Sequence, residues 1–226
     1  MRQRIRSILA SLESVGEDLL ALSDDIWLNI DHNDSSAVQR GSEFKIAFNE
    51  SASEFNRASA RLARLVEDFT ETPTFEAPAA PRSQEERDRR ERAIGSLDQS
   101  VPHTLEENFC YKRPVAFTVG RVPFDGTFTW SQVYETLVRH LASLKPSVFE
   151  ALPHNPAFVS SRGRKNFSRE ERDLRIPRDF GRGVLAETNL SANSIRDSMR
   201  RLLVEFGLAE RDFAVYLRED RDAEAV

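Results

Sequence analysis

Near the N-terminus, apolar residues recur at alternating spacings of three and four without a break. They are Ile5, Ile8, Leu12, Val15, Leu19, Leu22 and Ile26. This heptad spacing is typical of a helix that buries one narrow seam against another helix. Leu9, Leu20, Trp27 and Leu28 widen the stripe, so we expect this helix to pack against more than one neighbour.

A second helix is expected from Ser36 to Phe69, after a cluster of turn- and cap-forming residues at 31–36. Its seam consists of Phe44, Phe48, Ser51, Phe55, Ala58, Leu62, Leu65 and Phe69. The two segments are similar in length, so an antiparallel helical hairpin over residues 1–70 is the economical arrangement. Neither seam can be buried fully inside a two-helix hairpin. We therefore expect a coiled-coil oligomerisation arm whose contact includes the seven apolar residues of the first helix, or an arm that docks on the C-terminal part.

Composition narrows the class of protein. Charged residues make up 31% of the 226 residues, and the formal charge of −5 argues against a wholly basic nucleic-acid coat while allowing a local basic patch. The single cysteine, Cys110, excludes an internal disulfide framework and is expected to be a packed side chain. No signal peptide is evident, and no apolar run approaches the ~20 residues that span a bilayer. We expect no membrane contact and a cytoplasmic location.

Residues 71–104 are predicted to link two parts of the chain. Three prolines and several alanines between Thr72 and Pro81 predict a semi-rigid spacer. Ser83 and Glu86 have the spacing of a capping box, and the charged residues after them predict a short solvated helix. A domain boundary is placed here.

Residues 105–220 alternate short strand patterns with helix patterns without regular βαβ spacing, which predicts a small α+β domain with a mainly antiparallel sheet. Residues 221–226 are expected to form a frayed tail. The expected elements are a hairpin turning at Gly120-Arg121, a helix opened by Thr129, a short helix after Ser147, strands near 165–168 and 183–188, a helix over Ser191–Phe206 stopped by Gly207, and a strand over Phe213–Arg218.

A basic run extends from Arg162 to Arg182. Eight basic residues against four acidic ones leave a surplus of four positive charges on a chain whose total is negative. Arg162, Arg164 and Lys165 could neutralise phosphates, and Phe167 could stack on a base. An acidic protein partner would suit the same patch, and a solvated loop with local salt bridges is a further alternative.

The helix expected over Ser191–Phe206 buries an apolar stripe and leaves Arg196 and Arg200 toward solvent. Arginines on an exposed helix can read base edges, although they are more often ordinary solvated residues. No helix-turn sequence precedes this helix, so a helix-turn-helix protein is not predicted.

Signals for an enzyme are weak. The four histidines are scattered, and no nucleophile elbow or phosphate-binding glycine loop is present. His32 lies in a run that lacks the order of a calcium loop, and helix capping explains it more simply. Asp179, Glu187 and Asn189 could belong to a metal-dependent nuclease, but asparagine stands where a lysine would be wanted. We expect no catalytic residue, metal ligand or cofactor.

The leading prediction is a non-enzymatic homo-oligomer that contacts nucleic acid through the basic run and the arginine-bearing helix. A protein–protein adaptor without nucleic-acid contact is the alternative, and a metal-dependent nuclease is the third possibility. The arrangement of a helical arm before an α+β module does not by itself discriminate among them.

Overall fold

A computed structural model of the chain describes residues 2–71, 73, 75–97, 101–126, 129–160 and 163–218. Within these ranges the chain forms six α-helices and two three-stranded antiparallel sheets. The predicted α+β class is confirmed. The predicted tail at 221–226 lies outside the described residues.

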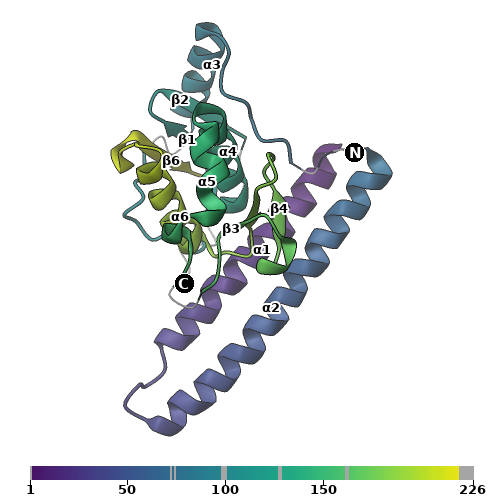
Figure 1. Cartoon of the computed structure of the whole chain (residues 1–226), viewed down its shortest axis with the longest axis vertical. Coiled ribbons are helices and arrows are strands. Elements are labelled where there is room, and N and C mark those ends of the chain that lie inside the picture. The colour runs from purple at the N-terminus through teal and green to yellow at the C-terminus, as the bar shows by residue number, and fades with distance from the viewer. Residues whose placement is uncertain are drawn as a thin grey trace.

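The first two helices form the predicted antiparallel hairpin, called the arm below. Helix α1 spans Arg2–Leu28, and α2 spans Ser35–Thr70. They are the longest elements and extend side by side beyond the rest of the molecule (Figure 1). Asp34 caps α2, because its carboxylate accepts a hydrogen bond of 2.8 Å from the Ser36 backbone N–H. The capping explanation for the polar cluster at 31–36 therefore holds.

Small residues, not the predicted seam, let the two helices of the arm approach each other. A Cβ at Gly16 would stand 2.0 Å from Oδ1 of Asn56 on the opposite helix. Ser23 donates a hydrogen bond of 3.0 Å to Asn49. Ala52, which lies between Asn49 and Asn56 on α2, is buried. The hairpin therefore forms without consuming most of its large apolar side chains.

Helix α3, at Gln84–Gly95, is the short charged helix expected in the linker. Ser83 caps it by accepting a hydrogen bond of 3.1 Å from the Glu86 backbone N–H. Arg90 donates to the carbonyl of Pro123 at 3.2 Å, and Ile94 is buried. This part of the predicted linker is thus a helix that contacts the α+β domain.

The first sheet has the strand order β2-β1-β6. Its strands are β1 at Pro114–Val119, β2 at Val122–Asp125 and β6 at Phe213–Leu217. Gly120 turns the β1–β2 hairpin with a φ of +58°, which suits the glycine that was expected there. Pro123 lies on the edge strand β2, where its missing N–H costs no ladder hydrogen bond.

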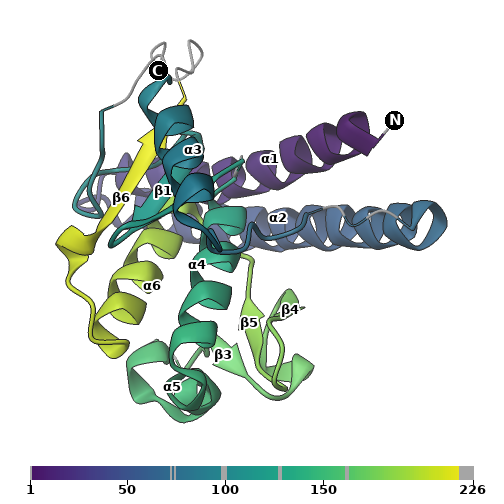
Figure 2. The same cartoon turned by 90° about the horizontal axis from the view of Figure 1, so that it is seen from above.

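Three further helices and a second sheet complete the domain. The helices are α4 at Trp130–Leu144, α5 at Pro146–Ala151 and α6 at Ala192–Glu205. The second sheet, ordered β3-β5-β4, has β3 at Phe167–Ser168, β4 at Pro177–Asp179 and β5 at Leu185–Glu187. Helices α4 and α6 lie between the two sheets (Figure 2). Sequence patterns did not predict β4.

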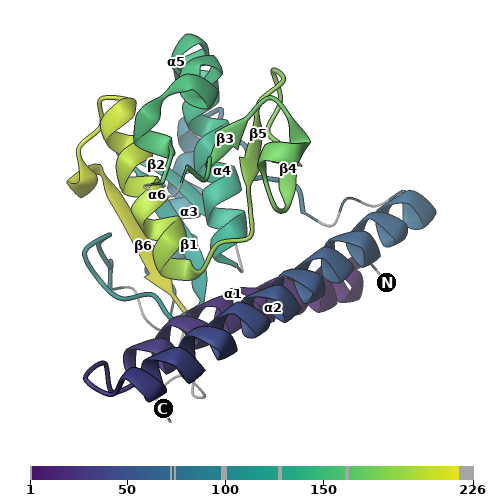
Figure 3. The same cartoon turned by 60° about the horizontal axis from the view of Figure 1, so that its bottom comes forward.

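The hydrophobic core belongs to the α+β domain. Buried aromatic rings from β1, α4 and the loops meet there, including Phe109 stacked on Trp130 with their ring centroids 4.4 Å apart. The arm lies along one side of this domain, as Figure 3 shows. One broad side of the hairpin is therefore docked on the domain and the other is turned away from it.

Candidate interaction surfaces and the arm junction

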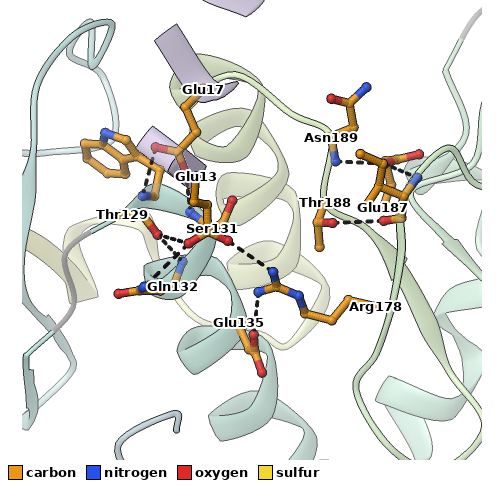
Figure 4. Close-up of polar contacts among 12 residues, drawn as sticks. Glu13, Glu17, Thr129, Ser131, Gln132, Glu135, Arg178, Glu187, Thr188 and Asn189 are labelled. Atoms are coloured by element: carbon orange, nitrogen blue, oxygen red, sulfur yellow. Dashed lines mark hydrogen bonds and ion pairs between the residues drawn. The ribbon is translucent and has the colours of Figure 1, made fainter. Parts of the chain in front are cut away.

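The arm is joined to the domain at the N-terminus of α4. Glu17 of α1 is buried, and its carboxyl group accepts hydrogen bonds from the backbone N–H groups of Ser131 at 2.8 Å and Trp130 at 3.3 Å (Figure 4). The first N–H groups of a helix have no partner within that helix. A side chain from the arm therefore satisfies donors that α4 cannot satisfy itself.

The protonation of Glu17 is unusual for a carboxylic acid. Burial and then the neighbouring carboxyl group of Glu13 raise the pKa of Glu17 from 4.5 to about 8, although the two backbone N–H groups act in the opposite direction. Desolvation disfavours the charged form of a buried carboxyl group. Most Glu17 side chains therefore carry the proton at neutral pH.

Beside Glu17, an arginine connects the arm to the domain through two carboxylates. Arg178 of β4 lies 3.1 Å from Glu13 of the arm and 2.8 Å from Glu135 of α4 (Figure 4). Glu13 also accepts a hydrogen bond of 2.6 Å from Thr129, the N-cap residue of α4. Three separate elements are thus held together by one charged group.

Further polar contacts follow the arm toward its loop. Arg113 donates to both carboxylate oxygens of Asp18, and Tyr111 donates to Asp25 at 2.6 Å. On the other helix, Asn56 donates to Asn189 at 2.7 Å. The side of the arm that faces the domain is therefore polar, and its side chains bond to residues of the domain.

A different side of the arm carries exposed large apolar residues, and we call this set the apolar face. It consists of Ile8, Val15 and Leu22 of α1 with Phe44, Leu62, Leu65 and Phe69 of α2. Successive members are separated by three, four or seven residues, except between Phe44 and Leu62, so each set follows one line along its helix. Phe69 is 91% exposed and Leu65 is 65% exposed. Ile5, Leu12, Leu19 and Ile26 of the predicted contact are only partly buried beside this line.

The two lines lie on the same side of the hairpin. In α1, Gly16 and Ser23 face α2 while Glu17 and Asp18 face the domain, which leaves the side with Val15 uncovered. In α2, Asn49 and Asn56 take the equivalent inward positions. A helical turn of 3.6 residues then places both apolar lines on the side of the arm that is turned away from the domain.

Among the described residues of the basic run, the side chains predicted to contact nucleic acid differ in exposure and in their partners. Arg162 lies outside the described residues, and Arg164 is exposed. Lys165 is paired with Asp173 at 2.7 Å. The prediction for Phe167 is wrong, because its ring is 1% exposed and packs edge-on against Phe158 in the core, out of reach of a base.

The arginines of α6 are also engaged. Arg196 donates to the carbonyl of Glu107 at 2.7 Å and pairs with Asp197, so it fastens α6 to the loop before β1. Arg200 pairs with Glu210 at 2.8 Å, although its side chain remains 39% exposed. Both guanidinium groups therefore already have structural partners within the fold.

The residues considered for a nuclease also have hydrogen-bond partners within the fold. Glu187 accepts backbone hydrogen bonds from Arg175 at 2.6 Å and Asn189 at 2.8 Å, so it organises the turn between β5 and α6. Burial raises the pKa of Glu187. Asp179 accepts from the Gly181 N–H at 2.7 Å. Within the described ranges, no three His, Cys, Asp or Glu side chains are grouped so that they could hold a metal ion.

The junction was not anticipated from the sequence. Glu13, Glu17 and Asp18 interrupt an apolar helix at 13, 17 and 18, and this was the only available signal that one side of α1 meets polar groups. Their partners lie 95 to 165 residues away in the chain. Sequence spacing carries no information about contacts at that separation.

Comparison with protein-family models, with curated proteins and with solved structures gives no match to this chain. Among the described helices, none is both long enough and apolar enough to cross a bilayer.

Proposed function

We propose that this protein is a non-enzymatic assembly protein that self-associates through the apolar face of its arm and so carries several copies of its α+β domain. The observation that supports this proposal is the apolar face itself. Large contiguous apolar patches on a protein surface mark association sites.

The packing inside the arm strengthens the proposal. Gly16, Ser23 and Ala52 already hold the two helices together, so the leucines and phenylalanines of the apolar face are not needed to close the hairpin. Exposing such side chains forgoes roughly 25 cal/mol for each Å² that could be buried. Burial against another molecule recovers that free energy.

The experiment compares the mass of the purified protein with that of two variants by light scattering. Leu65→Asp places a charge on the apolar face, whereas Ile46→Asp places one on the same helix at a residue of similar exposure, 60% against 65%, away from that face. We expect the wild type and Ile46→Asp to be oligomers and Leu65→Asp to be a monomer. A monomeric wild type, or equal masses for all three proteins, would refute the proposal.

Nucleic acid is a second candidate ligand, favoured by one specific observation. Arg164 is exposed and follows Gly163, whose φ of +74° turns the loop tightly and lets the backbone come close to a ligand. Phosphate contacts by such a loop would be weak singly, and assembly through the arm would multiply them.

Duplex DNA and duplex RNA at low salt are suitable probes for this candidate. Binding should weaken as salt increases, and Arg164→Glu should reduce both the affinity and the salt dependence. Arg211→Glu, at an exposed arginine far along the chain from this loop, is the matched control. Equal binding by both variants, or no binding by the wild type, would exclude the Arg164 loop as a nucleic-acid surface.

A further inference from the structure

We infer that the occupant of the apolar face is a second copy of this chain, placed antiparallel so that α2 lies on the partner's α2 and α1 lies on the partner's α1. This inference rests on the proposed function and adds the identity of the partner, the orientation and the register. Charge, side-chain size and interface area each support it.

The charge on the arm is divided between its two ends. Along the outer edge of α2, exposed Glu43, Glu50 and Glu54 come before exposed Arg57, Arg61 and Arg64, and this division is partly offset by exposed Arg40 at the loop end and by exposed Asp68 and Glu71 at the other end. Helix α1 runs antiparallel to α2, so its first residues, which include exposed Arg2, Arg4 and Arg6, lie beside the C-terminal end of α2 (Figure 1). The opposite end carries Asp24, Asp31 and Asp34.

This division selects one of the two symmetric ways to pair the hairpins face to face. If α1 lay on the partner's α2, the two arms would point the same way and the basic ends would meet. If each helix lies on the same helix of the partner, the arms are antiparallel and each basic end meets an acidic end. Opposite charges attract and like charges repel across an interface, so the second arrangement is favoured.

The α2 seam also fits a reversed copy of itself in size. When Phe55 is placed opposite the partner's Ala58, the reversed register places Ser51 opposite the partner's Leu62. Each of these central layers combines a large side chain with a small one, which fills space evenly. The same register places Phe44 opposite the partner's Phe69 and Phe48 opposite the partner's Leu65 at the ends of the seam.

Charged neighbours agree with this register. In an antiparallel pair, the residue before Phe55 on one copy and the residue before Leu62 on the partner lie next to each other along the same edge of the interface. These residues are Glu54 and Arg61, which are both exposed and have opposite charges. Two-fold symmetry makes this contact twice in each dimer.

The area is sufficient for a stable dimer. The 27 residues of α1 give the shorter helix a length of about 40 Å, at 1.5 Å per residue. Two adjacent helices are roughly 20 Å wide, so the shared face covers on the order of 800 Å² on each partner. That is the usual area for a specific protein–protein interface.

Disulfide trapping in the full chain tests the register directly. We would place Ser51→Cys in one copy and Leu62→Cys in another, each with Cys110→Ser to remove the native thiol, and co-express them. The inferred register brings these two positions together. Residue 51 of one copy would lie about 16 Å along the helix from the partner's residue 51, and residue 62 would be equally far from its own counterpart. These like pairs are too far apart to form a disulfide.

Oxidation should therefore give a mixed disulfide dimer when both variants are present and no disulfide dimer from either variant alone. Light scattering tests self-association separately from the register. A wild type that is oligomeric but yields no mixed disulfide would overturn the inferred register while leaving self-association intact. A monomeric wild type would overturn both.

A charge exchange gives a second measurement that does not need new thiols. Glu54→Arg should raise the dimer dissociation constant roughly tenfold, because it turns two attractive contacts into two repulsive ones. Adding Arg61→Glu should restore the wild-type constant, since the pairs are then reversed but attractive again. A double variant no tighter than Glu54→Arg would contradict the pairing of these residues.

Discussion

Replacing Glu17 with glutamine should remove a pH dependence from the stability of this protein. The folded chain holds the pKa of Glu17 at about 8, against 4.5 for an ordinary glutamate. Because the folded-state pKa is raised, the folded protein binds the proton more tightly than the unfolded chain does. The resulting stabilisation is complete below pH 4.5 and is lost as the pH rises through 8.

The magnitude follows from the width of this window. Each unit of pKa difference corresponds to roughly 1.4 kcal/mol. Between pH 5 and pH 7 the unfolded chain has lost its proton while the folded chain keeps it, so the free energy of unfolding should fall by about 2–3 kcal/mol. Between pH 7 and pH 9 the folded chain also releases the proton, and a further decrease of about 1 kcal/mol should follow.

Urea denaturation at pH 5, 7 and 9 measures the effect. Glu17→Gln keeps an oxygen that can accept from Ser131 but cannot titrate. The difference in free energy of unfolding between the wild type and the variant isolates the titration of Glu17 from that of every other group, provided both proteins are compared at one concentration. A difference in free energy of unfolding that stays constant from pH 5 to pH 9 would refute the raised pKa.

Three other substitutions follow from the same contacts. Phe167→Ala should lower the free energy of unfolding by about 3–5 kcal/mol in urea denaturation because it empties a core site, and a surface-like effect near zero would contradict its burial. Thr129→Ala should cost about 1 kcal/mol by the same assay, since it removes the N-cap of α4, and Thr129→Ser should retain most of that stability. Tyr111→Phe should cost about 1 kcal/mol and increase hydrogen exchange in the loop end of the arm, because it removes the hydrogen bond to Asp25; unchanged exchange there would argue against a docked arm.

Local patterns predicted the elements of this chain well. Capping residues identified the start of α4 and α6, and the heptad spacing identified α1 and α2. These signals depend on residues a few positions apart, where chain geometry fixes which side chains meet. Strand β4 was not predicted because its three residues, which include Pro177, show neither alternation nor strand-forming composition.

The candidate surfaces were harder to predict because they depend on which side of an element is covered. Phe167 has the composition of a stacking residue in a basic loop, but its strand turns the ring into the core. Arg196 and Arg200 were correctly placed on a helix that is partly exposed, yet their partners, Glu107 and Glu210, come from segments whose proximity only the tertiary structure determines. The heptad seam of α1 likewise specified a helix without specifying its neighbour.

The two broad sides of the arm carry different kinds of side chain. One side uses charged and polar groups, such as Glu17 and Asp18, whose geometry allows one docked position on the domain. The other side presents aliphatic and aromatic groups whose attraction is not directional. An apolar side alone would leave the orientation of a partner undetermined, but in the proposed pairing the acidic loop end and the basic opposite end of the arm would supply that orientation. On this reasoning, the charges on α2 should govern how the copies align, and the apolar residues should govern how tightly they bind.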